Sequence, residues 1–270
     1  MVDAATATAE KVRTSVEDGV AIIALNDPGT LNAAGVDMVA GLRAAFERHA
    51  ADDAVRCVIL TGEGRGFCSG ANLSGGGPAA GSSREESDAG AGLETVYNPF
   101  VTSLRNYPKP IVAAVNGPAA GVGASLALAC DLIVAAESAY FLQAFRRIGL
   151  VPDGGATYLL PRLVGKARAM ELALLGEKLP ARTALEWGLI NRCVPDAELM
   201  ATARDLARAL ADGPKSLAYI RRLIWESLDA EWAEQLHAER TVQRDAGRTE
   251  DFREGVTAFL QKRPAQFKGR

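Results

Sequence analysis

Residues that bind metals or form disulfides are scarce in this chain. It holds two histidines, His49 and His237, and four cysteines that form no CxxC pair. Structural zinc sites need closely spaced Cys or His ligands, and disulfide frameworks belong to small cysteine-rich secreted domains. The sequence therefore predicts no metal site and no disulfides. The cysteines are expected to be small buried hydrophobic residues.

Basic residues are not in excess, and long apolar runs are missing. The formal net charge is −3 over 270 residues, which argues against nucleic acid as a partner. The apolar run ASLALACDLIVAA is interrupted by Asp131, and no run is long enough to span a bilayer. The first residues contain no apolar signal core, so we expect a cytoplasmic protein without a membrane partner.

Short apolar runs do alternate with amphipathic stretches over residues 1–200, as they do in α/β proteins. Hydrophobic residues make up 48% of the chain, which is enough for a large core. The predicted strands are 20–26, 55–64, 109–117 and 132–136, and the predicted helices between them are 35–52, 93–107 and 118–131.

The pattern from Asp196 onward is almost entirely helical, and we divide the chain into a core (1–200) and a C-terminal helical region (201–270). One predicted helix in this region carries an apolar set consisting of Leu217, Ile220, Leu223, Ile224 and Trp225. A small helical region this apolar is often completed by another subunit. The sequence therefore predicts self-association.

Glycine-rich segments follow two of the predicted strands, GRGFCSGANL at 64–73 and NGPAAGVGASLALACDL at 116–132. A glycine at such a position lets a backbone N–H approach a ligand closely. Two amides that converge from different strands would form an oxyanion hole, which binds the negative oxygen of an enolate or a tetrahedral intermediate. The alternative is that these glycines serve only turn geometry and close helix–strand packing.

The second segment allows three other interpretations. A dinucleotide-binding loop would need a third glycine, but Leu126 stands at that position. A serine hydrolase would use Ser125 as nucleophile and His237 as base, although the second glycine of a nucleophile elbow is missing. A non-catalytic acyl-ligand binding protein would keep the glycine amides and need no acid or base.

One acidic residue, Asp153, stands in the apolar stretch IGLVPDGGATYLLPRL at 148–163. A carboxylate avoids apolar surroundings unless it is paired or used in chemistry. It is either a catalytic group or the cap of a helix that begins near Gly155.

Several motifs, taken in order, resemble the enoyl-CoA hydratase/isomerase (crotonase) family over nearly the whole chain. They are LNDPGTLNAAGVDM, VRCVILTGEGRGFCSGANL, KPIVAAVNGPAAGVGASLALACDLIVAA, RIGLVPDGGATYLLPRLVG and EDFREGVTAFLQKRPAQF. The resemblance implies an α/β spiral of ββα units and a C-terminal helical region that assembles trimers or pairs of trimers. It also implies acyl-CoA substrates, with CoA as part of the substrate and no separate cofactor, and an oxyanion hole formed by the amides of Ala71 and Val122.

The chain departs from the family's hydratases at the catalytic acids. Ser125 and Phe145 stand where those enzymes carry two glutamates, and Asn72 stands where an aspartate is common. Water addition needs one group to activate water and another to deliver a proton. The sequence therefore favours an isomerase over a hydratase with atypical acid–base residues.

The segments around Asp153 are similar to the ring-epoxide isomerases of bacterial phenylacetate degradation. In such enzymes one acidic residue at this position would move a proton between carbons, while the two amides hold the enolate oxygen. The resemblance also implies substrate contacts along the CoA and the acyl group, including positions that often reach a neighbouring subunit. We predict these contacts at Leu31, Ala33, Arg65, Ser69, Gly70, Asn72, Leu73, Gly121, Ser125, Phe145, Phe259 and Lys262.

Overall fold

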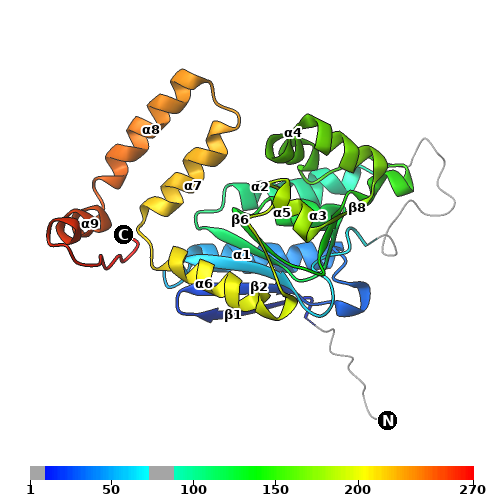
Figure 1. The fold of residues 1–270 in the computed structure, drawn as a ribbon, viewed down its shortest axis with the longest axis horizontal. Coiled ribbons are helices and arrows are strands. Elements are labelled where there is room, and N and C mark those ends of the chain that lie inside the picture. Colours follow the sequence, from blue (N-terminus) through cyan, green and yellow to red (C-terminus); the bar gives the residue numbers. More distant parts are fainter. Residues whose placement is uncertain (1–9, 73–87) are drawn as a thin grey trace, which may run out of the picture.

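The computed structural model describes residues 10–72 and 88–270. Leu73, one of the predicted substrate-binding residues, lies outside the described residues. Figure 1 shows a body in which helices surround β-sheets, and an arm of three helices that extends to one side of it.

The main sheet has six strands in the order β1-β2-β3-β4-β6-β9. β1 pairs antiparallel with β2, and every other neighbouring pair in this sheet is parallel. β3 and β4 lie in its middle and are almost fully buried, as apolar parallel strands covered on both faces should be. The strands are β1 (Val12–Glu17), β2 (Val20–Leu25), β3 (Cys57–Gly62), β4 (Ile111–Val115), β6 (Leu132–Ala136) and β9 (Arg192–Val194).

A second sheet of three short strands contains β5 (Pro118–Ala120), β7 (Tyr140–Leu142) and β8 (Lys178–Pro180). From β4 to β7 consecutive strands alternate between the two sheets, because β4 and β6 join the main sheet while β5 and β7 join the small one. Each of these strand pairs is followed by a helix. This is the α/β arrangement of ββα units that the resemblance implies.

The helices of the body connect the strands and cover the sheets. Helix α6 packs against β2, β3, β4 and β6, although the sequence-based division placed it with the C-terminal region. The change from body to arm therefore comes after α6, because the sheet needs this helix to bury its apolar face. These helices are α1 (Val36–Ala51), α2 (Asn98–Arg105), α3 (Val122–Leu128), α4 (Ala156–Leu175), α5 (Ala181–Glu186) and α6 (Leu199–Ala211).

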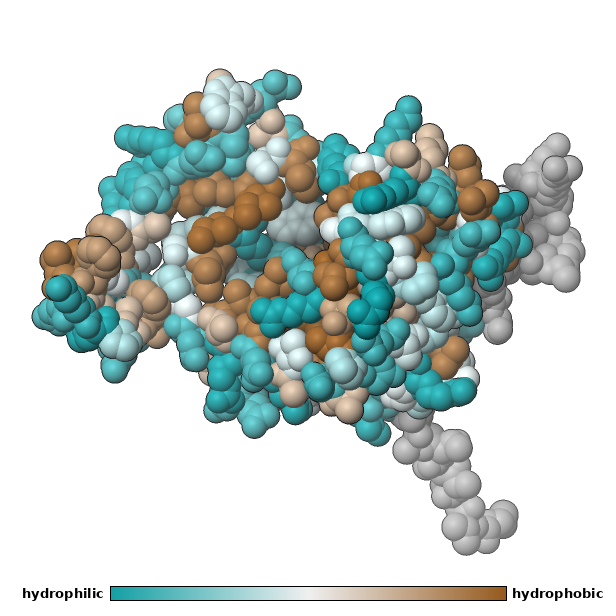
Figure 2. Space-filling view, viewed as in Figure 1, coloured by the Kyte–Doolittle hydropathy of each residue, from teal (hydrophilic) through white to brown (hydrophobic). Residues whose placement is uncertain are grey.

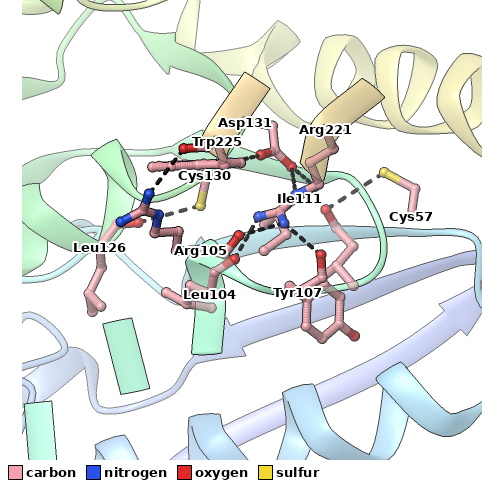
Figure 3. Close-up of polar contacts among 11 residues, drawn as sticks. Cys57, Leu104, Arg105, Tyr107, Ile111, Leu126, Cys130, Asp131, Arg221 and Trp225 are labelled. Atoms are coloured by element: carbon pink, nitrogen blue, oxygen red, sulfur yellow. Dashed lines mark hydrogen bonds and ion pairs between the residues drawn. The ribbon is translucent and has the colours of Figure 1, made fainter. Parts of the chain in front are cut away.

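The arm consists of α7 (Ser216–Ser227), α8 (Trp232–Ala246) and α9 (Glu250–Leu260). Arg221 of α7 joins it to the body, as Figure 3 shows. The Arg221 side chain is 5% exposed and its Nε lies 2.7 Å from Asp131 Oδ2. It also donates to the carbonyl oxygens of Leu104, Arg105 and Tyr107. A buried charge is stable here because each of the three guanidinium nitrogens donates to at least one acceptor.

Apolar side chains of the arm remain exposed in the single chain. Figure 2 shows them gathered on α7 where it faces the hollow beside the body, and on α9 at the tip. The large ones are Ile220, Ile224, Trp232, Leu236, Phe252, Val256, Phe259 and Leu260. A surface of this kind is typical of a protein–protein contact. No helix in the described part of the chain is long and apolar enough to cross a membrane.

Candidate active site

The two glycine segments lie side by side in the structure. Cys68 forms a parallel bridge with Ala119, and the N–H of Ala120 donates to Cys68 O at 2.9 Å. Gly70 and Gly121 have φ values of 109° and 52°, which residues with a Cβ rarely adopt. A Cβ on Gly70 would lie 3.1 Å from Ala120 O. Glycine at these places lets the two loops approach each other closely.

The residues that follow these glycines, Ala71 and Val122, present two unused amides. Within the described residues neither backbone N–H is donated to an acceptor, and Val122 is the first residue of α3. Gly70 and Gly121 lie in contact, since a Cβ on Gly121 would meet Gly70 Cα at 3.8 Å. Two neighbouring N–H groups of this kind can both donate a hydrogen bond to the oxygen of a polarised carbonyl.

Asp153 lies in the loop between a short 3₁₀ helix (Ala144–Ile148) and α4. Its Oδ1 is buried and has no hydrogen-bond partner among the described residues. Burial raises the pKa of this carboxyl group to about 6, because water no longer stabilises the charged form.

The structure shows no role for the Asp153 carboxylate as a helix cap. The residue before α4 is Gly155, and no side chain caps this end. The hydrogen bond from Asp153 to this helix uses its main-chain oxygen, which accepts the N–H of Ala156 at 3.1 Å. The carboxylate is therefore free for another task.

Ser125 connects the amide side of the site to the carboxylate side. It is fully buried in α3, and its Oγ donates to the main-chain oxygen of Asp153 at 2.9 Å. A Cβ on Gly154 would lie only 2.8 Å from Ser125 Cβ, so position 154 has no room for a side chain beside Ser125. His237 is exposed on α8 of the arm, and Ser125 and His237 form no hydrogen bond, which the hydrolase interpretation would need.

Phe145 takes a packing position next to the second glycine. Its ring atom Cζ lies 3.7 Å from the point where a Gly121 side chain would begin, and the residue is 7% exposed. An apolar ring therefore occupies the place where the resemblance expects a second glutamate in hydratases.

The family model described as "Enoyl-CoA hydratase/isomerase" matches residues 15–270. The chain belongs to the enoyl-CoA hydratase/isomerase family. It is 46% identical to the 1,2-epoxyphenylacetyl-CoA isomerase of Escherichia coli (strain K12), over 97% of this chain and 99% of the relative. It is 44% identical to a "probable enoyl-CoA hydratase" of Rhodobacter capsulatus, over 96% of this chain and 98% of the relative. The crystal structure of an enoyl-CoA hydratase from Polaromonas sp. JS666 superposes with a TM-score of 0.86 at 34% identity, and covers 95% of this chain and 99% of that one.

This member of the enoyl-CoA hydratase/isomerase family places Leu31 and Ala33 beside the first glycine motif. Ser69 N–H donates to Leu31 O at 2.9 Å, and Ser69 Oγ donates to Thr30 O at 2.8 Å. Ala33 N–H donates to Thr30 Oγ1 at 3.1 Å. The two segments are therefore joined by hydrogen bonds at Ser69, two residues before Ala71.

Two predicted contacts, Phe259 and Lys262, do not reach this site within one chain. Phe259 is 82% exposed at the end of α9, and Lys262 is exposed just beyond it. Both belong to the arm, which Figure 1 shows apart from the glycine loops. Arg65 and Asn72 are exposed near the first glycine motif. The predicted roles of these residues stay predictions.

Sequence reasoning missed Asn32, which stands between Leu31 and Ala33. It is fully buried, and its Nδ2 donates to Glu63 O at 3.0 Å and to Gly66 O at 2.7 Å. Its Oδ1 accepts the N–H of Asp27 at 2.8 Å. Asn32 thereby holds the loop that leads to the first glycine motif. An asparagine next to a turn is the available signal, because asparagine tolerates the positive φ of 59° found here.

A pocket begins at Gly154 and Gly155, directly after Asp153. It lies between α2 and α4, with α7 at one end, and its wall is both apolar and polar. Among the described residues no group of three or more His, Cys, Asp or Glu is placed to hold a metal ion. The pocket is lined by Asn98, Val101, Thr102, Arg105, Ala129, Gly154, Gly155, Tyr158, Leu159 and Trp225.

Proposed function

We propose that this protein is an acyl-CoA isomerase that moves a double bond, or rearranges a ring epoxide, through a thioester enolate. One observation carries the proposal. Asp153 is a partly buried residue whose Oδ1 has no hydrogen-bond partner among the described residues, and Ser125 of α3, the helix that begins at Val122, holds it through its main-chain oxygen.

The chemistry needs an electrophilic site for the thioester oxygen and one base. The amides of Ala71 and Val122 bind the developing oxyanion, which acidifies the proton on the neighbouring carbon. Asp153 removes that proton and returns it at another carbon. A carboxyl pKa of about 6 suits this task, because the group is ionised at neutral pH and more basic than an ordinary aspartate.

A single base agrees with the residues found at the other two positions. Ser125 is buried and donates to a main-chain oxygen, and Phe145 packs on Gly121. Burial is the only cause of the raised pKa of Asp153, so no other charged group among the described residues acts on it appreciably. Water addition wants two acid–base groups, whereas proton transfer between carbons needs one. Double-bond migration and ring-epoxide rearrangement are both isomerisations without net oxidation or reduction, so they require no redox cofactor.

The substrate class follows from the relative with 46% identity, which is named for 1,2-epoxyphenylacetyl-CoA. We propose cyclic or unsaturated acyl-CoA thioesters as substrates, with the acyl group in the pocket beyond Gly154. The CoA part would lie along Leu31 and Ala33, and Arg65 would meet a phosphate.

We further propose that the arm assembles a trimer or hexamer. Its exposed apolar residues would then be covered by neighbouring subunits. In such an assembly Phe259 and Lys262 of one subunit would reach the CoA bound to another.

The test is double-bond migration with a 3-enoyl-CoA in deuterated buffer. The wild-type protein should form the 2-enoyl-CoA, exchange deuterium at the carbons involved and add no water. Asp153→Asn should lower turnover by about 10³-fold, as expected for loss of a general base, while acyl-CoA binding is kept. Asp205→Asn, a change of the same kind on the exposed face of α6, should leave both unchanged.

A hydratase with atypical acid–base groups is the second candidate, because a relative at 44% identity is named a probable enoyl-CoA hydratase. Formation of a 3-hydroxyacyl-CoA from a 2-enoyl-CoA by the wild-type protein would favour it. Ligand binding without migration, exchange or hydration would instead indicate a non-catalytic acyl-CoA binding protein.

A further inference from the structure

The helical segment before β4 touches both halves of the proposed site. It begins with a π-helical turn, Leu93–Tyr97, and continues as α2. At one end Tyr97 Oη donates to Ala34 O at 2.6 Å. One turn further on, Val101 Cγ1 lies 3.8 Å from the point where a Gly155 side chain would begin. Isolated π-helical turns are frequent at functional sites.

Ala34 is the residue through which Tyr97 meets the amide side of the site. It is fully buried, and its N–H donates to Gly70 O at 2.7 Å. It also forms a parallel bridge with Ala71. A shift of the Ala34 peptide would therefore move the Gly70–Ala71 peptide, whose N–H is one of the two free amides.

We propose that Tyr97 is a positioning residue for the oxyanion hole: its hydroxyl holds the Ala34 carbonyl, and the Ala34–Ala71 bridge passes this restraint to the Ala71 N–H. The proposal rests on the proposed function, since it assigns Tyr97 a role in the same site. Sequence reasoning had no signal for it, because Tyr97 and Ala34 lie far apart in the chain.

The surroundings of Tyr97 keep its hydroxyl in the donor form. Burial raises the pKa of the phenol, and the nearby charge of Asp153 raises it further. The hydroxyl therefore stays protonated at neutral pH, where Asp153 is ionised. The hydrogen bond to Ala34 persists while the base is active.

The chain offers a matched control in Tyr107. Its hydroxyl also donates to a main-chain oxygen, that of Phe46 in α1, at 3.1 Å, and the residue is buried in the core. Tyr97→Phe and Tyr107→Phe each remove one phenol–carbonyl hydrogen bond and keep the ring. Both should cost stability, but only Tyr97→Phe should affect the oxyanion hole.

The experiment compares two ligands that differ at the thioester carbonyl. One is a 3-oxoacyl-CoA, whose enolate places a negative oxygen in the oxyanion hole. The other is the thioether analogue, in which a methylene group replaces the carbonyl. Tyr97→Phe should lower the preference for the 3-oxoacyl-CoA about tenfold and lower kcat by a similar factor, with KM nearly unchanged, because a displaced donor weakens transition-state binding. Tyr107→Phe should leave preference, kcat and KM unchanged.

A second pair of variants keeps the test decisive if Tyr97→Phe does not fold. Incorporation of 4-aminophenylalanine at position 97 retains a donor at the same place, whereas 4-fluorophenylalanine fills the space without donating. The amino variant should retain the ligand preference and the fluoro variant should lose it.

The outcomes separate the two proposals. If the wild-type protein prefers the carbonyl ligand and Tyr97→Phe, or the fluoro variant, keeps that preference, the role of Tyr97 is overturned while the proposed function stands. If the wild-type protein itself shows no preference, the oxyanion hole is absent and both proposals fail.

Discussion

Two aspartates near the middle of the chain differ in their hydrogen-bond partners. Asp153 lies in the site, and Asp131 lies at the base of the arm. Asp131 accepts the N–H of Ile111 at 2.7 Å, Arg221 Nε at 2.7 Å and Trp225 Nε1 at 2.9 Å. The Oδ1 of Asp153 accepts nothing from the described residues. Figure 3 shows Asp131 between Arg221 and Trp225.

The difference separates carboxylates that hold the chain together from one that is available for chemistry. The arm uses a second fully paired carboxylate, Asp251, which accepts the N–H groups of Lys215, Lys268 and Gly269. Every such bond lowers the free energy of the charged form and of the folded chain. Burial of Asp153 is not offset by such hydrogen bonds at Oδ1. Its carboxylate is therefore a stronger base than an ordinary aspartate, and its charge lowers the stability of the folded chain.

Removing the charge at Asp131 should have the largest effect on stability. Asp131→Asn leaves the guanidinium of Arg221 buried without its counter-charge, and breaking a buried pair in this way costs about 3 kcal/mol of unfolding free energy. Urea unfolding of the purified variant measures the loss. Asp229→Asn is the control, because Asp229 pairs with Arg105 at an exposed position and its loss should change little. Equal losses of unfolding free energy in the two variants would show that the buried pair contributes no more to stability than the exposed pair.

The rate of isomerisation should depend on pH through Asp153. The base works only when ionised, and its pKa is about 6. We therefore expect kcat/KM to be constant above pH 7 and to fall about tenfold per pH unit below pH 6. Stopped-flow or coupled assays at constant ionic strength measure this profile. A rate that is flat from pH 5 to 8 would show that Asp153 does not act as the base.

The charge on Asp153 should lower the stability of the folded protein, whereas the charge on Asp131 raises it, and the effect at Asp153 should be the smaller of the two. Its pKa is raised from 3.8 unfolded to about 6 folded, so the folded state holds more protons between these values. The stability of the wild-type protein therefore decreases as pH rises from about 4 to about 6. Asp153→Asn removes this penalty. The variant should be more stable by about 1 kcal/mol at pH 7, allowing for the partial exposure of the side chain, and nearly equal to wild type at pH 4. Thermal unfolding at both pH values tests this, and a variant that is less stable at pH 7 would refute it.

The strands that were predicted are the long apolar runs of the main sheet. Strands β5, β7, β8 and β9 were missed because each has only three residues, too few for a periodic pattern. Strand β1 was also missed, although the chain does carry a signal for it. Asp18 and Gly19 join β1 to β2 with φ values of 48° and 75°, and an Asp-Gly pair is typical of a tight hairpin turn.

The apolar periodicity and the glycine positions predicted, from sequence alone, an α/β protein with a glycine-rich segment after each of two strands. These are local properties, because hydrophobic pattern and allowed φ values act over a few residues. Tertiary structure alone decided that Asp153 Oδ1 would be buried without a hydrogen-bond partner among the described residues while the Asp131 carboxylate would have three, and that Tyr97 would reach Ala34. Burial and pairing depend on segments that are distant in the chain, and they set whether a carboxylate stabilises the fold or remains free to act as a base.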